Sequence, residues 1–316
     1  MHALPVTVVT GFLGAGKTTL VNRWLADLAS GDVAVIVNEL GAVGVDGALL
    51  AARAQTLVEI AGGCVCCSTQ AELVRALEVL AAQPVPPKRV LIETSGAASP
   101  AGVLRAVAAR DDAWQLDGII TVVDAARAEQ LAEHDLAIEQ VGYADVVVLS
   151  RADVCEAVQC AHAKDVIATH NGAAVIVTAV HGDSAEAPTL EALLALRRES
   201  FTPARAIAPT KHVYESLCFV AGFIDGERFA DFMERDLAQF SGRLFRTKGI
   251  LAVAGVAERM IVQGVADMVE VSLGEPWADT TPTSRFVIVG FGLDRDALSR
   301  AFDACVVERA ALSSRL

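Results

Sequence analysis

The sequence predicts an α/β protein: a doubly wound parallel sheet with helices on both faces, followed by a smaller α+β domain. First, a glycine-rich loop joins the apolar, β-branched run Val6–Thr10 to a helical pattern that starts at Leu20. Second, strand-like runs and helical patterns alternate to about Arg197. Third, the stretch Glu199–Thr210 carries two prolines and is followed mainly by strand-like runs. We therefore predict two domains, residues 1–200 and 201–316.

Composition and charge exclude several classes of protein. The net charge of −13 argues against a nucleic-acid partner, because such partners are held by neutralising phosphates. No apolar run approaches the roughly 20 residues needed to span a bilayer, so we expect no membrane association. The amino terminus lacks the basic region and cleavage site of a signal peptide. We expect a cytoplasmic protein with mostly reduced thiols, and a homo-oligomer is compatible with the sequence.

The first loop has the spacing of a phosphate-binding loop, G-x-x-x-x-G-K-[ST]. Its glycines let the backbone curl so that several N–H groups point at one anion, and the following helix adds its positive end. Lys17 is expected to reach the β- and γ-phosphates, and Thr18 to place its hydroxyl on Mg²⁺. An ordinary glycine-rich turn is the alternative. The residues expected to contact nucleotide in this loop are Gly11, Gly14, Ala15, Gly16, Lys17, Thr18 and Thr19.

The next predicted strand, Val33–Val37, runs into the polar stretch Asn38–Gly41. In a phosphate-loop protein, polar residues just beyond a core strand sit where a switch loop would lie. An ordinary connecting loop is the alternative.

A short predicted strand, Leu57–Ile60, opens onto two glycines and the thiols of Cys64, Cys66 and Cys67. Thiolates at this spacing can converge on one soft ion such as Zn²⁺, Co²⁺ or Cu(I). Buried small hydrophobes and a redox pair are the alternatives. Three close ligands without an obvious fourth favour an open, exchangeable site.

The run Arg89–Glu93 is predicted to be a buried strand that ends in an acid. In phosphate-loop nucleotidases an acid at this place holds Mg²⁺, usually through water, and we assign that role to Glu93. With Lys17 and Thr18 it completes the predicted catalytic residues. Gly96 follows in the next loop, where its backbone N–H can approach the γ-phosphate. A strand that simply ends in an acid is the alternative.

Two further core strands are predicted at Gly118–Asp124 and Asp145–Leu149. The second delivers Ser150-Arg151-Ala152-Asp153 where guanine-nucleotide sites carry N-K-x-D. The aspartate of that motif accepts two hydrogen bonds that adenine cannot supply, so Asp153 is expected to read guanine. Arg151 is expected to stack on the base. A helix N-cap at Asp153 is the alternative. A last strand of the first domain is predicted at Ala174–Val177.

After the linker the pattern predicts a smaller unit in which most segments are strands. The expected strands are His212–Phe223, Gly249–Val256, Met260–Val265, Val269–Leu273 and Arg285–Phe291, and the expected helices are Gly226–Phe240 and Asp294–Arg309.

Taken in order, the motifs resemble those of a known family. The segments GFLGAGKTTL, NE-x-G, GGCVCC, IETSG, VVDA and QVGYADVVVLSRAD resemble the CobW-type metallochaperone GTPases of the CobW/HypB/UreG P-loop group, close to the YjiA-like branch. The later segments RTKG, EPW and SRFVIVGFGL extend the resemblance over nearly the whole chain. A C-x-C-C sequence between the phosphate loop and the strand-end glutamate is specific to this group.

The resemblance implies GTP/GDP and Mg²⁺ binding, slow GTP hydrolysis, and Zn²⁺ or Co²⁺ held at Cys64, Cys66 and Cys67. The chain departs from the family at three points. Ala42 stands where the family often has a glutamate that could support metal binding, and Ser150-Arg151 replace Asn-Lys. The six histidines are scattered, which favours relay of a metal over its storage.

The predicted function is GTP-gated delivery of a metal ion to a client metalloprotein. The cysteine loop lies in the sequence between Asn38–Gly41 and Glu93, so a γ-phosphate that orders both flanks would change how the thiolates converge. Two alternatives stay open. An ATP-dependent enzyme such as a small-molecule kinase would be revealed by nucleotide competition. A nucleotide-regulated redox switch, in which the cysteines oxidise, would be revealed by anaerobic metal analysis with a thiol titration.

Overall fold

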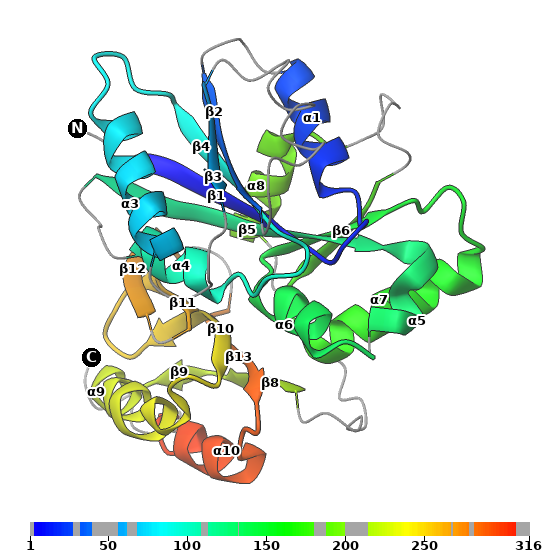
Figure 1. Ribbon diagram of the computed structural model, residues 1–316. Helices are drawn as coiled ribbons and strands as arrows, with labels where there is room; N and C mark the ends of the chain where they lie inside the picture. Colours follow the sequence, from blue (N-terminus) through cyan, green and yellow to red (C-terminus); the bar gives the residue numbers. More distant parts are fainter. Residues whose placement is uncertain are drawn as a thin grey trace. The chain divides into compact units, whose positions relative to one another are not determined.

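The computed structural model describes residues 3–27, 32–39, 56–61, 68–108, 113–131, 133–179, 188–199, 214–266, 268–277 and 281–307. The described strands form two separate sheets (Figure 1). The first sheet comes from the amino-terminal part of the chain and the second from the carboxyl-terminal part, as the sequence predicts. The predicted linker lies outside the described residues apart from Glu199, which ends helix α8, so the boundary near residue 200 stays a prediction.

The first sheet has seven strands in the order β3-β2-β4-β1-β5-β6-β7. Every neighbouring pair is parallel. Valine and isoleucine dominate these strands, which suits a sheet covered on both faces. The strands are β1 (Leu4–Thr10), β2 (Val33–Glu39), β3 (Thr56–Ala61), β4 (Arg89–Thr94), β5 (Trp114–Asp124), β6 (Val146–Ser150) and β7 (Val175–Thr178).

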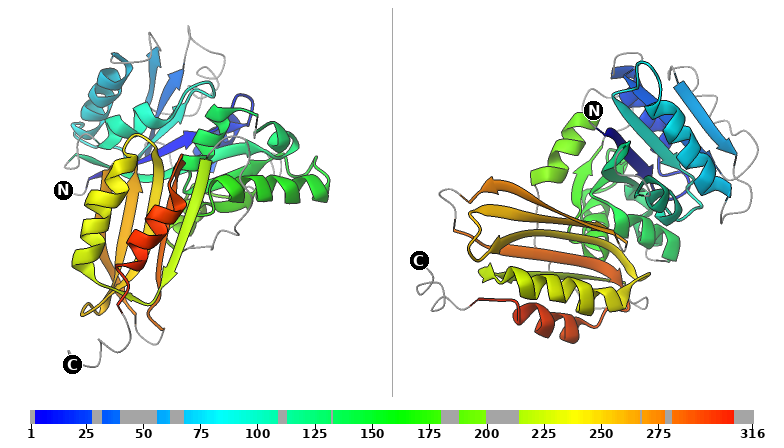
Figure 2. Two further views of the ribbon diagram at one scale, coloured as in Figure 1. Left: turned by 90° about the horizontal axis from the view of Figure 1, so that it is seen from below. Right: turned by 90° about the vertical axis from the view of Figure 1, so that its left-hand side faces the viewer.

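Helices cover both faces of this sheet, which confirms the predicted fold class (Figures 1 and 2). On one face α1 and α8 pack against alternate side chains of β1, β2, β4, β5 and β6. Helices α3, α4 and α6 lie on the other face. The helices are α1 (Lys17–Asp27), α3 (Ser68–Ala81), α4 (Ala101–Ala108), the 3₁₀ turn η1 (Ala125–Arg127), α5 (Ala128–Leu131), α6 (Asp135–Tyr143), α7 (Ala157–His170) and α8 (Leu190–Glu199).

The parallel arrangement brings the loops that carry chemistry to one edge of the sheet. In a parallel sheet all carboxyl ends of the strands meet at the same edge, and ligands of such folds bind there. The strands β1, β4, β5 and β6 end there at Thr10, Thr94, Asp124 and Ser150. Strand β3 also ends there, at Ala61, immediately before the segment that holds the cysteines.

The second sheet is antiparallel except for one short strand. Its order is β12-β11-β10-β13-β8, and β9 pairs in parallel with β10. Figure 2 shows its helices on one side of the sheet. The elements are β8 (Tyr214–Ala221), β9 (Phe223–Ile224), α9 (Gly226–Asp231), the π-helical η2 (Phe232–Leu237), the 3₁₀ turn η3 (Ala238–Phe240), β10 (Leu244–Val253), β11 (Glu258–Val265), β12 (Met268–Pro276), β13 (Ser284–Phe291) and α10 (Arg295–Asp303).

Phenylalanines fill the core between this sheet and its helices. The rings of Phe286 on β13 and Phe302 on α10 stack with centroids 6.1 Å apart. Phe229 of α9 meets Phe286 edge to face at 5.3 Å. These offset and edge contacts are the geometries that aromatic quadrupoles favour.

Two of the predicted helices differ from the observed ones. The predicted helix Gly226–Phe240 is α9 followed by the π-helical and 3₁₀ turns η2 and η3. The helix predicted to reach about Arg309 ends at Asp303. The chain leaves the helix because Val306 forms a β-bridge with Ile224, and the N–H of Val307 bonds to the carbonyl of Phe223.

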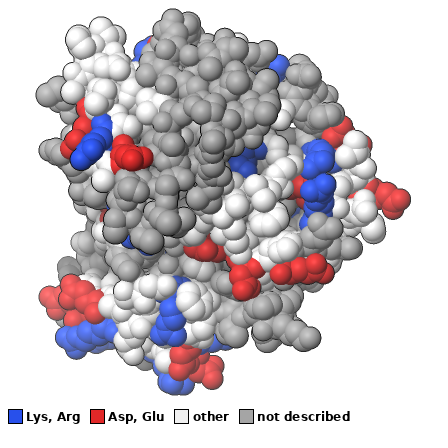
Figure 3. All heavy atoms as spheres, in the orientation of Figure 1, with Lys and Arg blue, Asp and Glu red and all other residues white. Residues whose placement is uncertain are grey.

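Charges of both signs are interspersed over the described surface in Figure 3, without an extended basic patch among those residues. Within the described part of the chain, no helix is both long enough and apolar enough to cross a membrane.

Candidate nucleotide site

The loop between β1 and α1 takes a backbone path that its glycines permit. Gly11, Gly14 and Gly16 have positive φ angles of 139°, 72° and 100°. A Cβ at Gly11 would lie 2.2 Å from the carbonyl oxygen of Val122 on β5, which no side chain can accommodate. The loop is therefore pressed against the neighbouring strand and opens towards the carboxyl edge of the sheet.

Lys17 begins α1 and is folded back over this loop. Its ammonium group donates to the carbonyl of Gly11 at 2.9 Å and to that of Phe12 at 3.2 Å. The residue is buried, and these two contacts hold its charge against the loop, where it would attract an anion.

Thr18 and Glu93 meet beside the loop. The Thr18 hydroxyl donates to a carboxylate oxygen of Glu93 at 2.6 Å. Close by, the ends of β4 and β1 are joined by a 2.8 Å hydrogen bond from the hydroxyl of Thr94 to that of Thr10. A hydroxyl and a carboxylate are the hard oxygen ligands that Mg²⁺ prefers, so this pair fits the ion that the sequence predicts.

Gly96 approaches the phosphate loop more closely than any other residue type could. A Cβ there would lie 2.7 Å from the backbone nitrogen of Leu13 and 2.9 Å from the ammonium of Lys17. The cavity beside this approach has a volume of about 270 Å³. It is lined by Leu13, Gly14, Gly16, Lys17, Thr18, Thr19, Val37, Glu93, Thr94, Ser95 and Gly96.

The loop after β6 is also hydrogen-bonded to the phosphate loop. The hydroxyl of Ser150 donates to the carbonyl of Ala15 at 2.6 Å. The guanidinium of Arg151 donates to the carbonyl of Gly14 at 2.9 Å and pairs with Asp124 at the end of β5. Arg151 has a φ of 55°, a left-handed conformation that is uncommon for a side chain of its size. The guanidinium that the sequence predicts on the base is therefore turned toward the phosphate loop.

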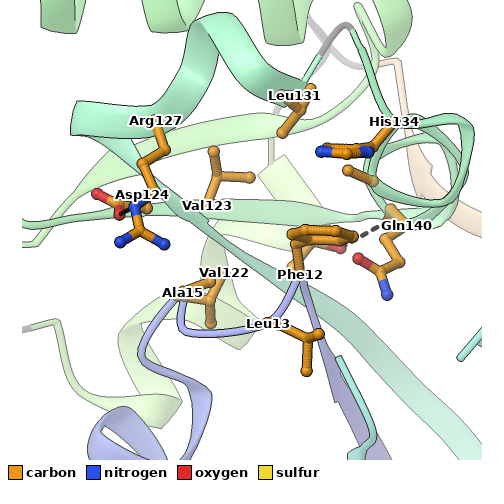
Figure 4. A pocket seen from close by; sticks show the side chains of 12 residues that line it. Phe12, Leu13, Ala15, Val122, Val123, Asp124, Arg127, Leu131, His134 and Gln140 are labelled. Carbon is orange, nitrogen blue, oxygen red and sulfur yellow. Dashed lines mark hydrogen bonds and ion pairs between the residues drawn. The ribbon is translucent and has the colours of Figure 1, made fainter. Parts of the chain in front are cut away.

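Asp153, two residues further on, is exposed. Asp124, the ion-pair partner of Arg151, is buried and also holds a second cation, because Arg127 lies 3.5 Å from the same carboxylate oxygen (Figure 4). Burial, followed by the neighbouring Cys160, raises the pKa of the Cys155 thiol, and the charges of Asp124 and Asp153 add to the effect.

The predicted metal loop lies outside the described residues. Strand β3, which precedes this loop, ends at Ala61, and Ala61 pairs with Glu39 at the end of β2. The side chains of Cys64, Cys66 and Cys67 are not among those described, nor are Leu40 and Gly41. Among the described residues, no group of three or more His, Cys, Asp or Glu side chains could hold a metal ion.

Comparison with known proteins decides the family. The family model described as CobW/HypB/UreG, nucleotide-binding domain, matches residues 5–178. The chain belongs to this family. A second model, the cobalamin synthesis protein cobW C-terminal domain, matches residues 214–306. The resemblance seen in the motifs is thus confirmed for both halves of the chain.

Relatives of this CobW-family chain match over almost its full length. It is 32% identical to the zinc chaperone YjiA of Escherichia coli strain K12, covering 96% of this chain and 98% of the relative. It is 33% identical to the zinc chaperone CobW of Pseudomonas aeruginosa, covering 94% and 90%. A crystal structure of Zn(II)-bound YjiA GTPase from E. coli superposes with a TM-score of 0.73 at 26% identity, covering 97% and 100%.

Three residues of this CobW-family site were not expected from the sequence. The sequence alone presents Ser150 as a replacement for asparagine and Asp124 as the end of a strand. Gln140 of α6 contacts the Gly96 loop, 44 residues away, and nothing local in the sequence indicates that contact. For Asp124 a signal existed, since an acid at the carboxyl end of a core strand lies at the binding edge.

Proposed function

We propose that this CobW-family protein binds and slowly hydrolyses GTP and delivers Zn²⁺ or Co²⁺ to a client metalloprotein under nucleotide control. The observation that carries the proposal is the cradle at the edge of the first sheet. It combines a glycine-lined loop, the buried ammonium of Lys17 and the Thr18–Glu93 pair, and the cysteine segment begins on the same edge.

The phosphates are assigned to the loop Gly11–Thr19. Backbone N–H groups of the loop and the positive end of α1 attract the β-phosphate. Lys17 exchanges its two carbonyl partners for phosphate oxygens, and the backbone N–H of Gly96 faces the γ-phosphate. Mg²⁺, held by Thr18 and through water by Glu93, would neutralise charge on the β- and γ-oxygens.

Guanine is assigned to the loop after β6. Asp153 is exposed at the correct edge, and a carboxylate there accepts from the N1–H and N2–H₂ groups of guanine. Arg151 replaces the usual lysine. Its hydrogen bond to Gly14 joins the loop after β6 to the phosphate loop, and its ion pair with Asp124 joins the same loop to the end of β5. We assign to its aliphatic stem the contact with the base.

The metal cargo is assigned to Cys64, Cys66 and Cys67. The segment that carries them follows β3, whose neighbour β2 ends in the switch-like Asn38-Glu39 and pairs with β4 at Thr94. Ordering of these strand ends by a γ-phosphate would change the convergence of the thiolates. Nucleotide state and metal affinity are then linked, and the linkage is reciprocal.

We assign the contact with the client to the second domain, residues 201–316, and the activity to the cytoplasm. The motifs of phosphate, base and metal binding all precede residue 200, which leaves the second domain without a chemical role of its own.

The decisive experiment is a titration of Zn²⁺ and of Co²⁺ into the reduced protein with GDP and with a non-hydrolysable GTP analogue. We expect the metal affinity to differ between the two nucleotides by a factor within about 5–150. Equal affinities would show that the nucleotide does not control metal binding, even if both sites exist. Tighter binding of ATP than of GTP in calorimetric competition would favour the kinase alternative. Oxidation of the thiols without metal uptake would favour the redox alternative.

Matched variants separate the two sites. The combined change Cys64→Ser, Cys66→Ser and Cys67→Ser should abolish tight metal binding and leave GDP binding intact, because hydroxyls are poor substitutes for thiolates. Cys218→Ser, on β8 of the second sheet, is the control and should bind metal as the unchanged protein does. Lys17→Ala should bind metal without responding to GTP. Persistence of tight metal binding in the triple variant would refute the cysteine assignment.

A further inference from the structure

Helix α6 holds the loop that follows β4. The side-chain amide of Gln140 donates to the carbonyl of Ala98 at 3.1 Å and to that of Gly96 at 3.4 Å. One turn of the same loop is closed by the N–H of Ala98 on the carbonyl of Ser95, at 3.2 Å. Gln140 thus joins a helix to the short loop that presents Gly96.

The position of Gln140 is itself fixed. Its backbone carbonyl accepts from the hydroxyl of Thr121 on β5 at 2.8 Å, and the residue is fully buried. The two carbonyl partners of the side chain require the amide nitrogen to face the loop. The amide oxygen lies on the wall of a neighbouring cavity and has no donor among the described residues (Figure 4). Within that part of the chain, the side chain therefore makes its hydrogen bonds only to the loop.

The amino-terminal end of α6 contacts the phosphate loop. His134, the N-cap of the helix, stacks on Phe12 with ring centroids 4.9 Å apart and the planes inclined by 17° (Figure 4). Phe12 supplies one of the two carbonyls that hold Lys17. One helix therefore contacts both loops that would surround the terminal phosphate.

The loop held by Gln140 has little freedom to shift toward the phosphate loop. At Gly96 the space for even a Cβ is taken by Leu13 and Lys17 within 3 Å. A loop that must place one N–H beside a phosphate in so close a space gains from a partner that fixes its carbonyls.

We infer that Gln140 is a positioning residue, which sets the preference for GTP over GDP by holding the Gly96 N–H in place for the γ-phosphate. This inference rests on the proposed nucleotide function of the same site. GDP has no γ-phosphate, so its binding does not depend on Gly96. Loss of the Gln140 amide therefore weakens GTP binding and hydrolysis selectively.

The test is calorimetry of the full-length protein with Mg²⁺ and either GDP or a non-hydrolysable GTP analogue. Gln140→Met keeps the length of the side chain and removes both donors. We expect its affinity for the GTP analogue to fall by at least about tenfold, while its affinity for GDP stays within about twofold. Gln115→Met is the control. It makes the same change at an exposed position near the start of β5 and should leave both affinities unaltered.

A second variant distinguishes positioning from mere packing. Gln140→Glu places a carboxylate against two carbonyl oxygens, and only its protonated form can donate a hydrogen bond. The GTP preference of this variant should recover as the pH is lowered, whereas that of the unchanged protein should not. Equal loss of GDP and GTP-analogue affinity, or an unaltered preference in both variants, would overturn the inference. Failure of the unchanged protein to bind either nucleotide would instead overturn the proposed function.

Discussion

Thr18 at the start of α1 donates a 2.6 Å hydrogen bond to Glu93 near the end of β4, across 75 residues of sequence. A hydroxyl and a carboxylate are oxygen ligands that suit Mg²⁺, and we propose that role for this pair. Thr18 lies on the helix that follows β1, and Glu93 lies on β4, which pairs with β1, so the pairing of these two strands brings the start of α1 beside Glu93.

The first prediction follows from that pair. Glu93→Gln retains an acceptor for the Thr18 hydroxyl and removes the negative charge. We expect the part of the GTP affinity that depends on Mg²⁺ to be lost and hydrolysis to fall at least about tenfold. Calorimetry with Mg²⁺ and with a chelator measures the first effect, and phosphate release measures the second. Glu72→Gln on the exposed side of α3 is the control, and equal effects in both variants would contradict the assignment.

Asp153→Asn should weaken GTP and favour the corresponding xanthine nucleotide. The change replaces a pair of acceptors by one acceptor and one donor, which matches the oxygen at position 2 of xanthine better than the amino group of guanine. Competition between the two nucleotides measures the switch. A GTP affinity that stays within about threefold would show that guanine is read elsewhere.

Two glycines of the phosphate loop should differ in their tolerance of alanine. A left-handed backbone costs an L-residue about 1–2 kcal/mol, so Gly14→Ala should lower the free energy of unfolding by roughly that amount. Gly11→Ala should lower it considerably more, because its Cβ would lie 2.2 Å from the Val122 carbonyl oxygen whereas that of Gly14 meets nothing nearer than 3.8 Å. Urea unfolding of both variants measures the difference, and equal costs would contradict it.

Stability should fall in mild acid because of His170. Burial lowers the pKa of this histidine below its ordinary value of 6.5. As the pH falls below 6.5, the unfolded chain therefore takes up a proton that the folded protein does not, and the free energy of unfolding decreases. His170→Gln should reduce this dependence in urea unfolding between about pH 7 and about pH 5. His162→Gln, exposed on the same helix, should keep it, and identical slopes in all three proteins would refute the prediction.

Cys305 should resist alkylation in the folded protein. Burial, with the charge of Asp236 as a second cause, raises the pKa of its thiol to about 11. At pH 8 only about one thiol in a thousand is then a thiolate, and the thiolate is the nucleophile. Peptide mapping after iodoacetamide treatment should show Cys160, which is partly exposed, labelled before Cys305, with both labelled in urea. Equal labelling of the two in the native protein would contradict the prediction.

Residues within one short segment were readable from the sequence because their chemistry is local. The phosphate loop needs only its own glycines, Lys17 and Thr18 between a strand and a helix. The doubly wound sheet followed from the alternation of apolar runs, which is also a local signal. The assignment of Cys64, Cys66 and Cys67 to a metal stays a prediction, because these residues lie outside those described.

The sequence by itself therefore determined the fold class, the family and the phosphate-binding loop. Only the tertiary structure decided that Arg151 turns to Gly14 and Asp124, that Ser150 fastens the loop at Ala15, and that Gln140 holds Gly96. The physical reason is that each of these contacts joins segments brought together by parallel strand pairing and helix packing. Such contacts depend on the arrangement of strands in the sheet, and no pattern of neighbouring residues records that arrangement.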